Sequence, residues 1–193
     1  MLGIFLDVET TGLDPMKHRT IEIAVQIYQL STGSQRASLR YTIRQPRRVW
    51  DLSDPVSLQV NGFTWEEVDD GISEEEAAAS ITALFTELEV QRGKAVFICQ
   101  NPAFDRAFFA QLIDIYTQEQ LGWPYHWLDF ASMYWAFKMR AIRDHDNIWP
   151  ESISLSKDSI AREFRIGEEA RPHRAMNGVE HLIRCYRTVV GMG

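Results

Sequence analysis

The chain has 193 residues, of which 45% are hydrophobic, and this suits one domain over residues 1–193 with a substantial buried core. Its 20 basic and 27 acidic residues give a net charge of −7, which argues against a protein that coats long duplexes but does not exclude binding of a short strand end. No apolar run reaches the roughly 18 residues of a membrane span, and the start lacks a signal-peptide pattern. We therefore expect a cytoplasmic protein without a membrane partner.

The first predicted strand carries two acids. An apolar run leads into Asp7 and Glu9, whose spacing of two residues places both carboxylates on one face of a strand. Burying two adjacent negative charges is costly unless a cation compensates them, and hard oxygen ligands suit Mg²⁺ or Mn²⁺. The plain alternative is an edge strand with Asp7 in solvent, where Thr10, Thr11 and Gly12 serve only the following turn.

Two further strands follow. Apolar and polar residues alternate over residues 21–28 and 39–44, which predicts an antiparallel meander with the first strand. A capping box formed by Ser73 and Glu76 then starts a helix, so the acidic cluster 74–76 is explained as a helix N-terminus without a functional role.

The second half of the chain alternates strands with helices. A short apolar strand at 95–99 leads through Asn101 into a helical pattern over 104–115, which places Asp105 near the helix start. Another strand is predicted over 127–130. The helices expected after it lie around residues 134–139, over 158–164 and after His173. The predicted fold is α/β, a mixed five-stranded sheet with a three-strand antiparallel meander, parallel strands and helices on both faces.

Three separated segments resemble one family in their order and spacing. They are DVETTG at the first strand, NPAFD at 101–105 and PHRAMNGVEH at 172–181. Together they are similar to the DEDD superfamily of 3′-to-5′ exonucleases, in its histidine-containing (DEDDh) branch, which includes polymerase proofreading subunits and related ribonucleases. The resemblance covers nearly the whole chain. It implies an RNase H-like fold and metal-dependent hydrolysis of phosphodiester bonds at single-stranded DNA or RNA 3′ ends, releasing nucleoside monophosphates.

The resemblance also implies residue roles. Asp7 would bridge two divalent cations, Mg²⁺ or Mn²⁺, with Glu9 binding one of them and Asp105 contributing a third carboxylate. His173 would act as the general base, since an imidazole titrates near neutral pH, although a lone histidine is more often structural. The residues expected to bind the terminal nucleotide are Thr10, Thr11, Gly12, Leu13, Phe63 and Asn101. Leu13 and Phe63 would pack on bases, whereas a turn-forming role explains Asn101 equally well.

One position departs from the family pattern. The fourth acid should stand five residues after the histidine, where this chain has Gly178. Glu180 does not simply replace this acid, because a step of two residues along a helix turns the side-chain direction by about 200°. Asn177 offers only a neutral oxygen. Two explanations stay open: Gly178 disables an otherwise competent enzyme, or the fold is kept as a nucleic-acid-end binding module with weak cleavage.

Other features leave weaker hypotheses. Asp144, His145 and Asp146 would suit a His-Asp phosphohydrolase site only with further ligands, so a solvated loop is the better interpretation. Arg47 and Arg48 lie in a predicted loop, where their side chains would either guide a nucleic-acid strand or simply be solvated. Beyond the nucleic acid, a second copy of the chain in a homodimer and a recruiting protein both stay open as partners.

Overall fold

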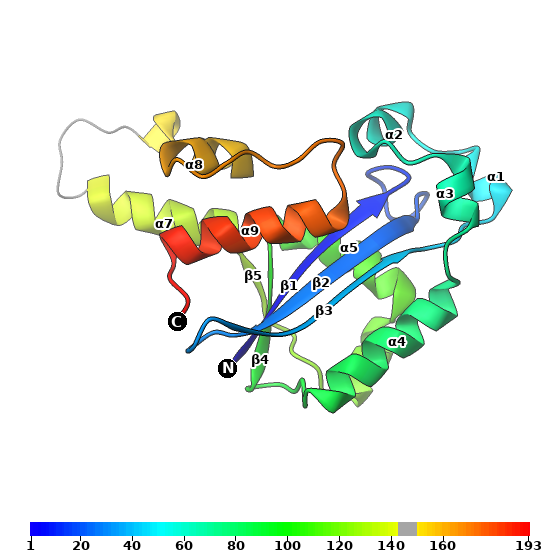
Figure 1. Ribbon diagram of the computed structural model, residues 1–193, viewed down its shortest axis with the longest axis horizontal. Helices are drawn as coiled ribbons and strands as arrows, with labels where there is room; N and C mark the ends of the chain where they lie inside the picture. The colour runs from blue at the N-terminus through cyan, green and yellow to red at the C-terminus, as the bar shows by residue number, and fades with distance from the viewer. Residues whose placement is uncertain (143–149) are drawn as a thin grey trace.

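A mixed sheet of five strands lies at the centre of the part that the computed structural model describes, residues 1–142 and 150–193 (Figure 1). The strands are β1 (Leu2–Thr10), β2 (Thr20–Gln29), β3 (Ser34–Thr42), β4 (Ala95–Cys99) and β5 (Trp127–Asp129). Their order is β3-β2-β1-β4-β5, with β1, β2 and β3 antiparallel and with β4 parallel to both β1 and β5. The predicted meander with parallel strands is confirmed.

Helices cover both faces of this sheet and make two separate cores. The first face packs against α4 (Glu74–Glu87) and α5 (Pro102–Leu112). The second packs against α7 (Phe130–Ile142), α8 (Lys157–Glu163) and α9 (Ala175–Val189). Successive side chains of a strand point to opposite faces, so Ile4 and Leu6 enter the first core while Phe5 enters the second.

Several short helices were not predicted from the sequence. They are α1 (Arg47–Trp50), α2 (Pro55–Asn61), α3 (Trp65–Asp69), α6 (Ile115–Gln120) and the 3₁₀ turn η1 (Pro150–Ser152). The predicted loop around Arg47 and Arg48 is therefore helical. The helix expected over 104–115 ends at Leu112, because the Asp114 side chain accepts from the Tyr116 and Thr117 N–H groups and starts α6.

The fold brings three chain segments to one end of β1. The C-terminal end of β1, the start of α5 and the start of α9 meet there, with α2 and α3 beyond the strand tip (Figure 1). Among the helices of the described residues, none is both long and apolar enough to cross a membrane. The His-Asp cluster at 144–146 lies outside the described residues.

Candidate active site

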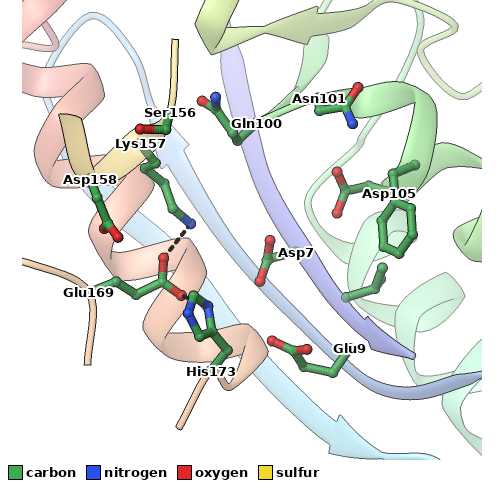
Figure 2. Close-up of a pocket in the computed structure, with 12 residues that line it drawn as sticks. Asp7, Glu9, Gln100, Asn101, Asp105, Ser156, Lys157, Asp158, Glu169 and His173 are labelled. Carbon is green, nitrogen blue, oxygen red and sulfur yellow. Dashed lines mark ion pairs between the residues drawn. The ribbon is translucent and has the colours of Figure 1, made fainter. Parts of the chain in front are cut away.

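The three acids expected to bind metal line one cavity of about 320 Å³ together with His173 (Figure 2). Asp7 and Glu9 extend from β1 on the same face as Phe5, toward α9. Asp105 enters from the first turn of α5. These four residues are separated by up to about 170 positions along the chain, yet the structure brings them to one cavity, as the sequence predicts.

Three acidic side chains are crowded together in this cavity. Burial raises the pKa of Asp7 to about 7, with the nearby Lys157 charge opposing that rise. Burial and then the Asp7 charge raise the pKa of Glu9 to about 8. The same two causes hold the pKa of Asp105 well above its ordinary value. Carboxyl groups crowded in this way favour the uptake of either protons or a cation.

The Asp7 and Glu9 carboxylates are also without hydrogen-bond partners among the residues that the structure describes. Both residues are half-buried and line the cavity, so their carboxylates are open to a ligand there. With Asp105, these oxygens form a donor set of the kind that Mg²⁺ and Mn²⁺ prefer. The chemistry of these residues fits a divalent cation, but their oxygens do not form a set of three within 4.8 Å of one another in the structure, so the side chains would have to rotate to share one ion.

His173 lies in the loop before α9 and is held from two sides. Its backbone N–H donates to the carbonyl of Val60 over 3.1 Å. Its Nδ1 lies 3.1 Å from Oε1 of Glu169, whose side chain is only 4% exposed. A carboxylate at Nδ1 favours the proton on that nitrogen, which leaves Nε2 free to accept one.

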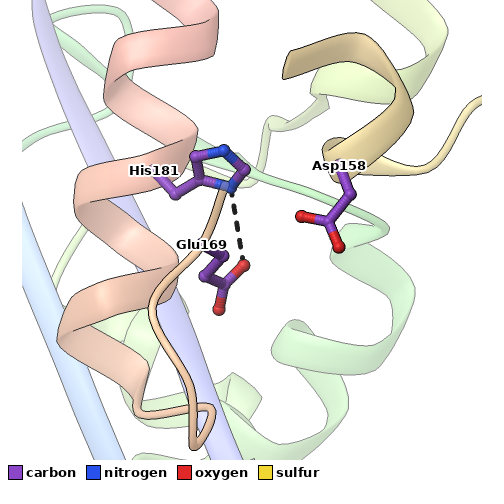
Figure 3. A group of neighbouring side chains, drawn as sticks. All are labelled: Asp158, Glu169 and His181. Carbon is purple, nitrogen blue, oxygen red and sulfur yellow. Dashed lines mark ion pairs between the residues drawn. The ribbon is translucent and has the colours of Figure 1, made fainter. Parts of the chain in front are cut away.

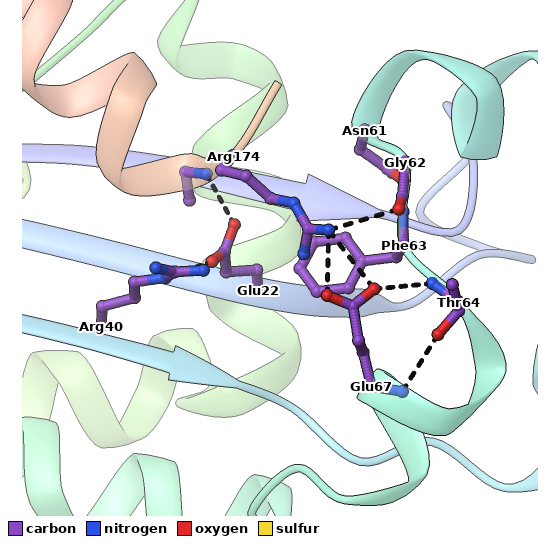
Figure 4. Close-up of polar contacts among 9 residues, drawn as sticks. Glu22, Arg40, Asn61, Gly62, Phe63, Thr64, Glu67 and Arg174 are labelled. Atoms are coloured by element: carbon purple, nitrogen blue, oxygen red, sulfur yellow. Dashed lines mark hydrogen bonds and ion pairs between the residues drawn. The ribbon is translucent and has the colours of Figure 1, made fainter. Parts of the chain in front are cut away.

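A polar network fixes the start of α9 next to this loop (Figure 4). The Ala175 N–H donates to Glu22 Oε2 over 2.6 Å, and Glu22 also pairs with Arg40 at 2.5 Å. The Arg174 guanidinium donates to Glu67 over 3.0 Å and to the Gly62 carbonyl over 3.2 Å. Because these contacts tie α9 to β2 and to the α2–α3 turn, they orient the segment that carries His173.

Gly178 lies directly beneath the Asp7 carboxylate. A Cβ added at this buried glycine would stand 2.2 Å from Asp7 Oδ2, well inside van der Waals contact. The space that a side chain would need at position 178 is therefore filled by Asp7 itself. This explains why glycine is accommodated on the first turns of α9, despite its poor helix propensity.

Sequence reasoning missed several residues of the cavity, two of which, Lys157 and Glu169, form an ion pair. The Lys157 Nζ lies 2.8 Å from Glu169 Oε2 and donates to the Gly178 carbonyl over 3.3 Å. Although burial alone would raise it, contacts with His181 and Lys157 lower the pKa of Glu169 to about 2. One sequence signal pointed to Lys157: it is the first residue of α8 after the Ser156 cap, where the helix dipole disfavours a cation.

The residues expected to bind the terminal nucleotide are more scattered. Asn101 lines the cavity in a left-handed conformation, with φ of 60°. Thr10 and Thr11 are buried in the turn after β1, where the Thr10 hydroxyl donates to the Gly12 carbonyl over 2.8 Å. The Leu13 side chain beyond them is 73% exposed.

Phe63 lies against the segment that carries His173. It is only 5% exposed, and the Arg174 guanidinium stacks over its ring at 3.7 Å from the centroid. A base can reach this ring only if Arg174 moves, whereas Leu13 is open to contact.

Comparisons with known proteins agree with this geometry. A family model described as Exonuclease (RNase T) matches residues 4–186. The chain is 27% identical to an oligoribonuclease of Coxiella burnetii over 175 residues, which cover 89% of this chain and 92% of that protein. It is 30% identical to an oligoribonuclease of Azoarcus sp. (strain BH72) over 134 residues, covering 62% of this chain and 73% of the relative.

Solved structures show the same fold. A structure of exonuclease I aligns with a TM-score of 0.74 at 20% identity, covering 98% of this chain and 41% of that protein. E. coli exonuclease I in complex with a dT13 oligonucleotide aligns with a TM-score of 0.73 at 20% identity, over 97% of this chain and 41% of that one. This chain thus spans about two fifths of exonuclease I. Because the family model spans almost its whole length, the chain belongs to the RNase T/DEDDh exonuclease family.

Proposed function

We propose that this chain is a divalent-cation-dependent exonuclease that removes nucleoside monophosphates from the 3′ ends of short single strands. The observation that carries the proposal is the convergence of Asp7, Glu9, Asp105 and His173 on one cavity. Two relatives are named oligoribonucleases, and exonuclease I has been solved with single-stranded DNA, which supports a single-stranded DNA or RNA substrate. The net charge of −7 favours short ends over long duplexes.

In this proposal Asp7, Glu9 and Asp105 hold Mg²⁺ or Mn²⁺. A bound divalent cation supplies an activated water and stabilises the negative charge that develops on the phosphodiester. His173 accepts the proton of the attacking water at Nε2, because Glu169 lies against Nδ1. Thr10, Thr11, Gly12, Leu13, Phe63 and Asn101 remain the proposed contacts to the terminal nucleotide.

A direct assay tests this function. Single strands of DNA and RNA, labelled at the 5′ end, are incubated with the chain in Mg²⁺ or Mn²⁺, with and without EDTA. We expect a ladder that shortens from the 3′ end, that disappears with EDTA and that is blocked by a 3′-terminal modification. No shortening of either nucleic acid with either ion would contradict the proposal.

Gly178 favours a second candidate, a module that binds strand ends and cleaves them weakly. This position lacks the carboxylate expected there, and Asp7 fills the space. In the same assay a pure binder would retard the intact strand on a native gel without a ladder. A Gly178→Asp variant separates the two explanations of the glycine: a gain in turnover would support a disabled enzyme, and no gain would count against it.

A further inference from the structure

The cavity fits one divalent cation better than two. Asp7 shares the cavity with Asp105 and also lies against Gly178 of α9, so a second cation on the Gly178 side would need ligands from α9. Position 178 of α9 offers no carboxylate to Asp7, and the Gly178 carbonyl oxygen already accepts from Lys157 over 3.3 Å.

Asp7 lies between the Lys157 ammonium and Asp105 in Figure 2, and the ammonium donates to the Gly178 carbonyl. The Lys157 side chain is only 14% exposed and lines the same cavity as the three acids. An ammonium in this position compensates the carboxylates and repels any divalent cation that approaches from the same side.

Glu169 does not replace the missing carboxylate as a free ligand. Its Oε2 lies 2.8 Å from the Lys157 Nζ, and its Oε1 lies 3.1 Å from the His173 Nδ1. Both oxygens are therefore already engaged. Glu169 instead holds the ammonium in place and links it to the histidine that we propose as the base.

The group of Asp158, Glu169 and His181 has ligand atoms within 4.8 Å of one another, a spacing that could suit a metal ion (Figure 3). However, the Glu169 oxygen that faces His181 Nδ1 at 3.6 Å is the one paired with Lys157. The positive charge next to Asp158, Glu169 and His181 is therefore supplied by the Lys157 ammonium. Lys157 also stands at the first residue of α8, where the helix dipole opposes it, so its partners must hold it there.

We propose that the Lys157 ammonium takes the place of one of the two divalent cations, so that the chain binds a single ion at Asp7, Glu9 and Asp105. This inference rests on the proposed metal-dependent function and specifies its cofactor. Lys157 then acts as a fixed positive charge on the Gly178 side of Asp7. Glycine at position 178 leaves space for the Asp7 carboxylate, and its carbonyl oxygen accepts from Lys157.

Counting bound ions tests the proposal without relying on activity. Isothermal titration with Mn²⁺, checked by the electron paramagnetic resonance of free Mn²⁺, gives the number of ions per chain. We expect one ion for the natural chain and two for the double variant Lys157→Met, Gly178→Asp. Two ions on the natural chain would overturn the proposal, and so would one ion on a double variant whose melting curve shows it folded.

The matched control is Lys138→Met. Lys138 forms an ion pair of the same 2.8 Å length with Glu163, and its side chain is 17% exposed, but it lines a different cavity. We expect this variant to bind one ion, as the natural chain does; two ions would show that the count does not report on Lys157. A natural chain that binds no ion would contradict the proposed function as well, so the two failures are distinguishable.

Discussion

The two sides of the cavity around Asp7 differ in how their charges are compensated. On the Asp105 side the carboxylates form no ion pair within the described residues, and burial raises their pKa values. On the Gly178 side, Lys157 and Glu169 form a buried ion pair of 2.8 Å. The Gly178 side is thus compensated by Lys157, a cation of the chain itself, whereas the Asp105 side is where we propose that a divalent cation from solution binds.

Removing a carboxylate from the uncompensated side should have the largest effect. We predict that Asp105→Asn lowers turnover on a single-stranded oligonucleotide by about 10³-fold or more, because a bound metal contributes several kcal/mol of transition-state stabilisation. Gel assays of the labelled strand measure this loss. The matched control is Asp114→Asn, which keeps a capping side chain at α6, outside the cavity, and should leave turnover unchanged. Equal turnover for Asp105→Asn and Asp114→Asn would contradict the proposed role of the Asp105 side in binding the cation.

Replacing His173 should have the second-largest effect on turnover. We predict that His173→Gln lowers turnover by about 10²-fold, because a positioned general base typically contributes 10²- to 10⁴-fold. Binding of Mn²⁺ should stay the same, since His173 is not among the proposed ion ligands. A pH–rate profile of the natural chain and the variant measures the effect. If the variant kept the full rate and the same profile, another group would be the base.

A smaller effect is expected on the compensated side. We predict that Glu169→Gln lowers turnover by about tenfold, as for residues that orient a catalytic side chain. The variant should also be less stable at neutral pH. The pKa of Glu169 is lowered in the folded chain, so its stabilisation is present above pH 4.5 and is lost as the pH falls toward about 2.

Denaturant unfolding across this pH range checks the sign of that prediction. The difference in unfolding free energy between the natural chain and Glu169→Gln should narrow as the solution becomes more acidic. A difference that widened in acid would show that the Glu169 carboxylate is not held ionised by its partners.

The smallest effect concerns the stability of the metal-free chain. The pKa values of Asp7 and Glu9 are raised to about 7 and about 8, so the folded chain retains protons that the unfolded chain releases near pH 4. Stability should therefore fall as the pH rises from about 4 to 8. We predict that Asp7→Asn with Glu9→Gln raises the melting temperature at pH 8 by at least about 2 °C without metal.

Two further conditions, acid pH and added Mg²⁺, test the cause of this difference in melting temperature. Near pH 4 the advantage of the variant should disappear, because the carboxyls of the folded natural chain are then protonated. Addition of Mg²⁺ at pH 8 should raise the melting temperature of the natural chain but not that of the variant. A variant that melts below the natural chain under metal-free conditions would contradict the electrostatic argument.

Much of this site could be predicted because its residues follow local rules. The spacing of Asp7 and Glu9 on a strand, and of Asp105 on a first helical turn, determines their direction whatever surrounds them. Lys157 and Glu169 could not be predicted in the same way. Their contact depends on how α8 and the loop before α9 pack against the sheet, and an isolated lysine is ordinarily solvated. Likewise, the break between α5 and α6 depends on the cap made by Asp114.

In our proposal Lys157 and one divalent cation lie on opposite sides of Asp7. Anomalous scattering from Mn²⁺ in crystals of the natural chain, grown with excess MnCl₂, tests it most directly. We expect one peak, bound by Asp7, Glu9 and Asp105, with the Lys157 Nζ still in contact with Glu169. Two peaks on opposite sides of the Asp7 carboxylate, with Lys157 displaced, would contradict it.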